Sequence, residues 1–364
     1  MEGMVETSKY LGDPKTADWV YQGTPLVYNN ESILLTMPAR SVGTVLATTT
    51  YMWYGTVTAR LKTSRGAGIV TAFILLSDVK DEIDYEFVGT ELEIAQTNYY
   101  SQGIPIYANS ANLTLSNTYH NWHTYQIRWT PDTITWLVDN QVGRVKKRSD
   151  TWNATANQWN YPQTPARVQI SIWPGGASSN APGTIQWAGG LVDWDSDDIN
   201  KYGYDFATFG EISIQCFNAS SAPGTNNAVS YTYNNLVALN NSVGNGYKPT
   251  VLRSFLGTGL DMDIEEQRSS ISSSESQTHA PVDSIPGGSP SLPASGEHMQ
   301  SGFSSTVVIA SSSTSCAESS FSQYCGSSSG SSKSDGGRIV RGQRVLGASA
   351  IAVVIAFGAV HFVM

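Results

Sequence analysis

Residues 81–89 read DEIDYEFVG, and this stretch decides which fold and which chemistry the chain is expected to have. It follows the apolar run at residues 68–76, which is typical of a buried strand bounded by glycine and then by polar residues. Because side chains alternate along a strand, Glu82, Asp84 and Glu86 are expected on one face and the apolar residues between them on the other. Taken alone, such a pattern is most simply an exposed acidic strand. The motifs that follow it along the chain favour a functional interpretation.

Two carboxyl groups on one face are what glycoside cleavage with retention requires, one as nucleophile and one as proton donor. Crowded like charges raise the pKa of some members, so one group can stay protonated near neutral pH while another is ionised. On a flat strand the α-carbons of Glu82 and Glu86 would lie about 13 Å apart. Strand curvature and inward-leaning side chains must therefore bring the carboxyl groups to roughly 5 Å for the retaining geometry.

Four segments that follow residues 81–89 along the chain carry further motifs. They read QTNYY at residues 96–100, HTYQIRWTPD at 123–132 with WLVD at 136–139, IWPGG at 172–176, and WAGGLVDW at 187–194. Together with residues 81–89 they resemble the motifs of family-sixteen glycoside hydrolases, the jelly-roll β-glucanases, and especially those of the fungal Crh-type cell-wall transglycosylases. The resemblance covers about residues 17–245, and the ordered succession of motifs makes it specific.

The resemblance assigns roles to the acidic strand. By position in the motif, Glu82 is the nucleophile, Glu86 the general acid/base, and Asp84 the assisting group that tunes the nucleophile. It also implies a retaining transglycosylase, in which a sugar hydroxyl rather than water intercepts the glycosyl-enzyme. Chitin is the implied donor and β-glucan or chitin the implied acceptor, so the enzyme would crosslink the fungal wall.

Aromatic and amide side chains are the expected sugar-binding groups, because pyranose faces are apolar and their edges are rich in hydroxyls. By family position the candidates are Gln96, Asn98 and Tyr99, on the strand beside the acidic one. Trp173 and Trp187 join them, since each lies next to a glycine pair where the backbone is bare.

The fold is predicted to be all-β. Residues 1–255 are rich in Tyr, Trp, Thr, Val and Ile, show no convincing helical period, and contain short alternating segments at regular spacing. Such segments favour a two-sheet sandwich, which the resemblance makes a concanavalin-like jelly roll. Trp129 and Trp136 are assigned to its core.

The rest of the chain is predicted to be a stalk and an anchor signal. The stalk is residues 256–336; within it, residues 269–334 contain 26 serines in 66 positions, a composition of disordered and O-glycosylated segments. Residues 337–364 combine a polar spacer with an apolar tail long enough to cross a bilayer. This pattern favours a GPI-anchor signal with attachment at Ser334; a tail-anchored membrane helix is the alternative.

The glycosylation sequons favour secretion, although one expected element is missing from the sequence. Five N-x-[ST] sequons occur, at Asn30, Asn112, Asn153, Asn218 and Asn240. The opening residues MEGMVE lack the apolar core of a signal peptide, so the natural start is expected further upstream. The predicted location is the cell surface and wall, with a lipid anchor in the plasma membrane.

The composition of the chain limits the classes of molecule that we expect it to bind. The net charge is −9 and the β region has no basic cluster, which argues against nucleic acid and suits neutral polysaccharides such as chitin and β-glucan. We expect a monomer without metal or other cofactor. Cys216 is expected to be a buried free thiol, whereas Cys316 and Cys325 are close enough in sequence to close a small loop.

Other functions remain open at this stage. A β-glucan hydrolase would use the same residues with water as the acceptor. A glycan-binding wall protein without activity would keep the sandwich, but it would not need all three acidic residues. A structural mannoprotein would make the serine stalk the purpose of the chain, which a well-patterned domain of this size disfavours.

Overall fold

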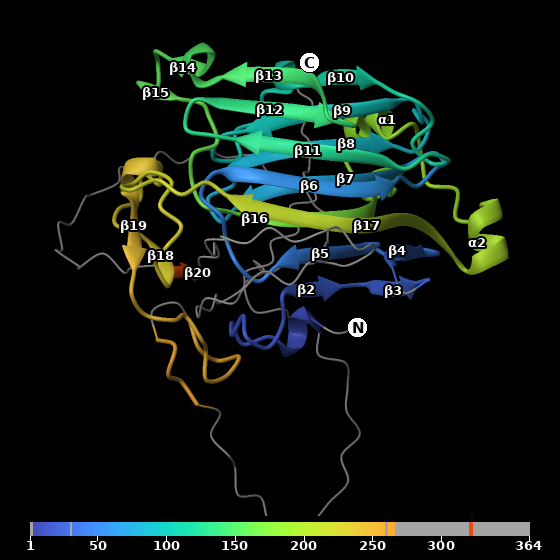
Figure 1. Cartoon of the computed structure of the whole chain (residues 1–364). Helices are drawn as coiled ribbons and strands as arrows, with labels where there is room; N and C mark the ends of the chain where they lie inside the picture. The colour runs from blue at the N-terminus through green and yellow to red at the C-terminus, as the bar shows by residue number, and fades with distance from the viewer. Residues whose placement is uncertain (1–2, 30, 259–260, 266–319, 323–364) are drawn as a thin grey trace, which may run out of the picture.

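Two β-sheets packed face to face form the body of the protein (Figure 1). The structure is a computed structural model, and it describes residues 3–29, 31–258, 261–265 and 320–322. Within these residues the predicted all-β sandwich is confirmed.

One sheet has eight strands in the order β1-β2-β5-β16-β7-β8-β9-β10. These strands are β1 (Met4–Glu6), β2 (Trp19–Gln22), β5 (Thr44–Thr48), β16 (Ala166–Pro174), β7 (Ile69–Ser77), β8 (Glu82–Val88), β9 (Ile94–Tyr100) and β10 (Ala111–Thr114). All neighbours in this sheet are antiparallel except β1 and β2. The acidic stretch forms β8, between β7 and β9.

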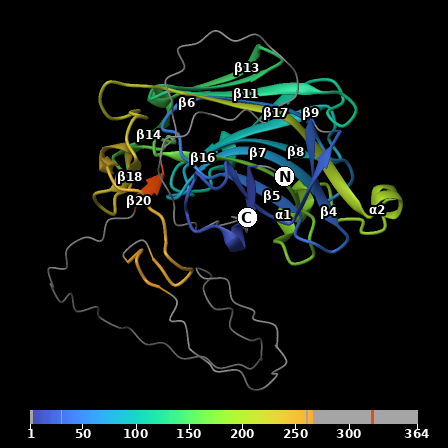
Figure 2. The ribbon, with the colours of Figure 1, turned by 60° about the horizontal axis from the view of Figure 1, so that its bottom comes forward.

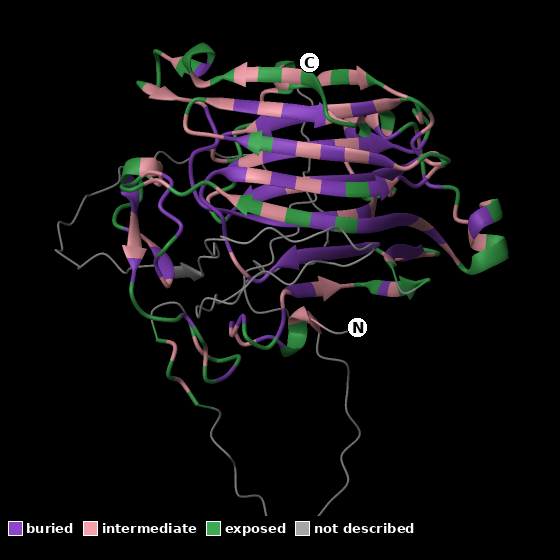
Figure 3. Cartoon of the chain, in the orientation of Figure 1, coloured by how far each residue is buried: buried purple, intermediate pink, exposed green. Residues whose placement is uncertain are grey.

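The other sheet has seven strands in the order β13-β12-β11-β6-β17-β4-β3. They are β13 (Gln141–Lys147), β12 (Thr133–Val138), β11 (His123–Trp129), β6 (Gly55–Lys62), β17 (Tyr204–Cys216), β4 (Ser32–Pro38) and β3 (Thr24–Tyr28). Strands β6 and β11 alternate between buried and more exposed positions (Figure 3), as expected of a sheet with one face in water.

Short elements complete the described chain. Two helices that the sequence did not predict, α1 (Pro182–Trp187) and α2 (Asp197–Tyr202), interrupt the segment between β16 and β17. Short 3-10 turns lie at Thr7–Lys9, Tyr107–Asn109, Arg148–Thr151 and Asn240–Ser242. Two small sheets join β14 (Trp152–Asn153) to β15 (Gln158–Trp159), and β18 (Ser230–Tyr233) to β19 (Val243–Gly246) and β20 (Ser320–Ser322). Figure 2 places α2 and the β18–β20 pair at opposite ends of the sandwich.

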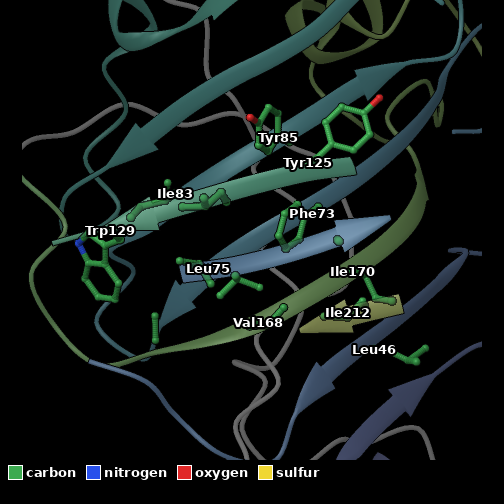
Figure 4. Packing of buried hydrophobic residues seen from close by; sticks show 14 of the residues in the cluster. Leu46, Phe73, Leu75, Ile83, Tyr85, Tyr125, Trp129, Val168, Ile170 and Ile212 are labelled. Carbon is green, nitrogen blue, oxygen red and sulfur yellow. The ribbon is translucent and has the colours of Figure 1, made fainter. Parts of the chain in front are cut away.

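The core lies between the two sheets, where alternate side chains of both sheets interdigitate (Figure 4). Phe73 on β7 and Tyr85 on β8 face Tyr125 on β11, and the rings of Tyr85 and Tyr125 meet edge to face at 5.3 Å. Trp129 and Trp136 are 1% and 0% exposed, so their assignment to the core is confirmed. Strand β7, unlike β6, is buried almost throughout, so its outer face is also covered.

One cysteine assignment is wrong. Cys216, at the end of β17, is half-buried and disulfide-bonded, not a free thiol. Strand alternation was the reason for expecting burial, and it carries no information about a covalent partner far away in the sequence. Cys316 and Cys325 lie outside the described residues, as do Asn30, Ser334 and residues 337–364. In the part that the structure describes, no helix is long and apolar enough to span a membrane.

Asp81 fixes the point at which β8 begins. Its carboxylate is 2% exposed and accepts hydrogen bonds from the backbone N–H groups of Gln102, Gln163 and Thr164 and from the Thr164 hydroxyl, at 2.7–3.1 Å. These bonds tie the start of the acidic strand to the segment that leads into β16. Asp81 is therefore a structural residue of the motif.

We expect Asp81→Asn to lower the free energy of unfolding by about 1–3 kcal/mol, because one acceptor oxygen becomes an amide that faces N–H donors. Urea denaturation measures this loss. Asp132→Asn is the control, since Asp132 is exposed, and it should change little. Equal stability of the two variants would contradict the role given to Asp81.

Candidate active site

The three acidic residues of β8 face away from the core, as predicted. The register sets Glu82 between Leu76 and Tyr100, Asp84 between Ile74 and Asn98, and Glu86 between Ala72 and Gln96. The residues between the acids, Ile83, Tyr85 and Phe87, are at most 2% exposed and belong to the core. One strand thus separates a charged face from an apolar face.

A groove runs across this outer face of the eight-stranded sheet. Its lining includes Glu82 and Glu86 of β8, Ala72, Ile74 and Leu76 of β7, Ser171 and Trp173 of β16, Val45 of β5 and Gln22 of β2. The β7 residues form a floor of short or aliphatic side chains beside the acids. That floor withholds water from the carboxyl groups and offers them no countercharge.

Burial raises the pKa of all three carboxyl groups. The pKa of Glu82 rises to about 7, and that of Glu86 rises to about 8 with a further contribution from the charge of Glu82. Burial raises the pKa of Asp84 well above its usual range, and the charges of Glu86 and Glu82 raise it further. Mutual repulsion, the cause expected from the sequence, therefore acts, but removal from water is the larger cause. All three carboxyl groups therefore keep their protons to a higher pH than an ordinary carboxyl group does.

Asp84 is the most enclosed of the three acids. Its side chain is 1% exposed, and within the described residues neither carboxyl oxygen has a hydrogen bond of standard geometry. The charge of Arg144 and the backbone N–H of Asn98 lower its pKa without offsetting the burial. In its protonated form Asp84 can donate a hydrogen bond to a neighbouring carboxylate, which would be the assisting role expected for it.

The seven-stranded sheet holds β8 in place through the core. The indole Nε1 of Trp136 donates to the backbone carbonyl of Asp84 at 2.9 Å, and the Tyr85 hydroxyl donates to the Leu137 carbonyl at 2.9 Å. The Arg144 guanidinium lies 4.5 Å above the Trp136 ring and donates to the carbonyl and hydroxyl of Thr97 on β9 at 2.8 Å. The middle of the acidic strand is therefore fixed from beneath.

Trp173 and Trp187 lie together at one side of the groove. Their rings stack with centroids 6.0 Å apart and planes 28° from parallel, and both are partly exposed. The indole Nε1 of Trp187 donates to Gln96 Oε1 at 2.8 Å, so Trp187 is tied to the strand beside the acids. Three of the predicted sugar-binding residues thus form one cluster.

The glycine pairs beside these tryptophans form a close backbone joint. Gly176 donates to the Gly68 carbonyl at 2.9 Å and accepts from the Val192 N–H at 3.1 Å, while the Gly68 N–H donates to the Ala188 carbonyl at 2.8 Å. A Cβ on Gly176 would overlap the Gly190 carbonyl oxygen. The two motifs are therefore glycine-rich because their backbones touch, and this contact brings the two indoles together.

The remaining sugar-binding candidates, Asn98 and Tyr99, lie on opposite faces of the neighbouring strand β9. Asn98 lies on the groove face, where its Nδ2 donates to the Tyr100 hydroxyl at 2.7 Å. Tyr99 does not line the groove: its side chain is 3% exposed, lies in the core and donates to Asn109 Oδ1 at 3.0 Å. Tyr100, opposite Glu82, holds the groove position that sequence reasoning missed. Strict alternation from Gln96 and Asn98 would have found it.

No group of three or more His, Cys, Asp or Glu side chains among the described residues is arranged to hold a metal ion. His123 is buried on β11 with its Nδ1 2.7 Å from Asp139 Oδ2 and its Nε2 3.0 Å from the Ser116 hydroxyl. It packs the hairpin of β11 and β12, away from the acidic residues.

The raised pKa of Glu86 has a consequence for stability. Between pH 4.5, the ordinary value, and about 8, the folded protein keeps a proton that the unfolded chain has released. Stability therefore falls as the pH rises through this window. Glu86→Gln removes this titration, so we expect it to melt about 2–4 °C above the unmodified protein near pH 9, which corresponds to about 1 kcal/mol. Near pH 4.5 the two should melt together.

Thermal melts over this pH range measure the difference. Glu211→Gln is the matched control, because Glu211 is an exposed glutamate of the seven-stranded sheet. A variant of Glu86 that is less stable than the unmodified protein at alkaline pH would show that its carboxylate is stabilised in the fold.

Comparison with known proteins agrees with this geometry. Residues 13–189 match the family described as glycosyl hydrolases family 16. The chain is 61% identical over 266 residues to Crh-like protein 3 of Botryotinia fuckeliana, covering 73% of this chain and 60% of that one. It is 49% identical over 290 residues to Crh-like protein 2 of Aspergillus fumigatus, covering 79% and 65%. The chain thus spans less than two thirds of the length of either relative.

Solved structures give the same result. The fold is similar to that of an apo Crh5 transglycosylase, with a TM-score of 0.54 and 29% identity over 63% of this chain and 88% of that chain. A second structure of that transglycosylase, in complex with NAG, matches with the same TM-score and coverage at 27% identity. The predicted jelly-roll sandwich is therefore confirmed. Residues 13–189 therefore match glycosyl hydrolases family 16, and the chain is similar to the Crh-like proteins and to the Crh5 transglycosylase.

Proposed function

We propose that this chain is a retaining transglycosylase of the fungal cell wall, which cleaves a chitin donor and transfers it to β-glucan or chitin. The observation that carries the proposal is the pair Glu82 and Glu86, on one face of β8, in a groove, with pKa values of about 7 and about 8. Two carboxyl groups that ionise in sequence supply a nucleophile and an acid at the same pH.

In the first step the Glu82 carboxylate attacks the anomeric carbon of the donor sugar. Glu86 gives its proton to the glycosidic oxygen, the bond to the leaving chain breaks, and a covalent glycosyl-enzyme remains on Glu82. In its protonated form Asp84 would donate a hydrogen bond to Glu82 during this step, which favours the ionised nucleophile despite its burial. The apolar floor of Ala72 and Ile74 keeps bulk water from competing for these protons.

In the second step Glu86, now a carboxylate, takes a proton from an acceptor hydroxyl. The acceptor oxygen attacks the anomeric carbon, the bond to Glu82 breaks, and the original ionisation states return. A sugar acceptor wins over water only if the groove holds it in place, which effective molarities of about 10⁵ M or more permit. We assign this hold to Trp187 and Gln96, with Trp173 and Asn98 completing the sugar-binding set.

Chitin as donor is the finer part of the proposal. It is supported by the similarity to Crh-like proteins and by the solved relative, a transglycosylase in complex with NAG. A β-glucan hydrolase would use the same two glutamates with water as the acceptor. A glycan-binding protein without activity is disfavoured, because three crowded acids with raised pKa values destabilise a fold that needs no catalysis.

The cellular location and the lipid anchor are also part of the proposal, and the sequence supports them. We place the protein at the cell surface, as a monomeric N-glycosylated enzyme whose partners are wall polysaccharides. A GPI anchor, with its signal at residues 337–364 and attachment at Ser334, would hold it to the plasma membrane. The similarity to Crh-like proteins supports a location at the wall.

We expect Glu82→Gln and Glu86→Gln each to reduce transfer by about 10²–10⁴-fold or more, because one removes the nucleophile and the other the proton donor. Asp84→Asn should be impaired less. The assay incubates labelled chitin oligosaccharides with glucan or chitin acceptors and sizes the products. Full activity of Glu82→Gln would contradict the proposal.

A donor with an activated aryl leaving group separates the two roles. Such a leaving group needs no proton, so Glu86→Gln should still form the glycosyl-enzyme from it, whereas Glu82→Gln should not. Glu211→Gln controls for the loss of a glutamate elsewhere and should keep full activity. Products that are only shortened chains would favour the hydrolase.

We expect Trp187→Ala to lower the ratio of transfer to hydrolysis by about two- to tenfold, the size of one aromatic contact, while donor cleavage changes less. The ratio is measured from the same sized products. Trp187→Phe keeps an aromatic ring but loses the hydrogen bond to Gln96, so its ratio of transfer to hydrolysis should lie between those of Trp187→Ala and the unmodified protein. Trp152→Ala removes an exposed indole from the small β14–β15 sheet and should change nothing. Equal loss of both activities would place Trp187 on the donor side.

A further inference from the structure

A continuous row of side chains crosses the eight-stranded sheet through Glu86. Each member is directly opposite the next in the register, so all project from the same face. The row is Gln22, Val45, Ser171, Ala72, Glu86, Gln96 and Asn112. The first five line the groove, so the groove follows this row and its continuation leads across β9 to Asn112.

Asn112 lies where this row ends. It is on β10, the edge strand of the sheet, two strands from Glu86, which is roughly 10 Å between α-carbons at ordinary strand spacing. Its cross-strand neighbour Gln96 holds Trp187, so Asn112 adjoins the sugar-binding cluster. A sugar chain that extends from Glu86 in this direction passes over Gln96 and reaches Asn112 next.

Asn112 is also the first residue of a glycosylation sequon, Asn112-Leu113-Thr114. Asn112 and Thr114 are both exposed, whereas Leu113 between them packs towards the core. The acceptor amide and the hydroxyl that the modification requires therefore share the accessible groove face.

The other described sequons differ in position. Asn153 lies on β14, Asn240 in a 3-10 turn whose Ser242 is 0% exposed, and Asn218 on the exposed segment after β17. Among the described sequons, Asn112 alone belongs to a strand of the eight-stranded sheet. A glycan elsewhere would decorate the surface, whereas a glycan here would stand in the path of the substrate.

We propose that an N-linked glycan on Asn112 closes the β10 end of the groove and limits how many sugar units bind beyond Glu86. The glycan is bulky and hydrated, so it occupies the space that a longer chain would need over Gln96 and β10. Short chains, which end before β10, bind as well with the glycan as without it. The inference rests on the proposed function for secretion and for sugar binding in the groove.

The test produces the full chain, behind a secretory leader, in a host that N-glycosylates. Peptide mapping measures occupancy of Asn112. Asn112→Gln and Thr114→Ala remove the glycan in different ways, enzymatic deglycosylation removes it without a substitution, and Asn218→Gln is the control for an exposed sequon elsewhere. Binding of short and long labelled chitin oligosaccharides is measured with Glu82→Gln also present, so that nothing is turned over.

We expect Asn112 to be occupied, and its loss by each of the three routes to tighten binding of long chains by about tenfold, or about 1.4 kcal/mol, with short chains unchanged. Asn218→Gln should change neither. An unmodified Asn112, or the same dependence on chain length with and without the glycan, overturns the inference. Because binding is the readout, a chain that binds but fails to transfer would refute the proposed activity and leave this test intact.

Discussion

Three carboxyl groups crowded on one face of β8, each with a pKa raised by burial, are the constraint on which the rest of the structure depends. Such an arrangement disfavours folding, because burial penalises the charged form and the charge of Arg144 acts on Asp84 without offsetting that penalty. The fold supports it from the opposite side of the same strand. Tyr85 packs against Tyr125 and bonds the Leu137 carbonyl, while the Trp136 indole bonds the carbonyl of Asp84 itself. The packing and hydrogen bonds on the apolar face of β8 thus offset the destabilisation caused by the carboxyl groups on its other face.

The same constraint produces the chemical asymmetry of the site. Glu82, Asp84 and Glu86 are alike in sequence context, and their pKa values separate because their surroundings differ in depth and in nearby charge. Asp84, in the middle, is enclosed by its neighbours, and this burial raises its pKa well above the usual range, whereas Glu82 and Glu86 line the open groove. Arg144 is the cation that moderates the pKa of Asp84, and it reaches the site from an edge strand of the other sheet. Both sheets are therefore needed to set the ionisation of one strand.

The placement of the proposed sugar-binding residues depends on backbone contact. Gly176, Gly190 and Gly68 come from three separate segments and touch without side chains between them. That contact sets Trp173 beside Trp187, and the bond from Trp187 to Gln96 connects the pair to β9. Aromatic rings so placed would offer the proposed pyranose substrate an apolar surface. A bulkier residue in the joint would move the rings before it touched a substrate.

The sequence by itself determined which face of a strand each side chain is on, because side chains alternate along a strand. Alternation along residues 81–89 was enough to separate Glu82, Asp84 and Glu86 from the core, and alternation elsewhere identified the strands and the sandwich. Family position, followed in place of alternation, was wrong at Tyr99, which lies in the core. Only the tertiary structure decided the register that puts Tyr100 opposite Glu82, the reach of Arg144 towards Asp84, and the disulfide at Cys216. The physical reason is that these features join segments far apart in the chain. The local alternation of apolar and polar residues shows which face a side chain is on, whereas the pairing of distant strands decides which side chains lie next to it.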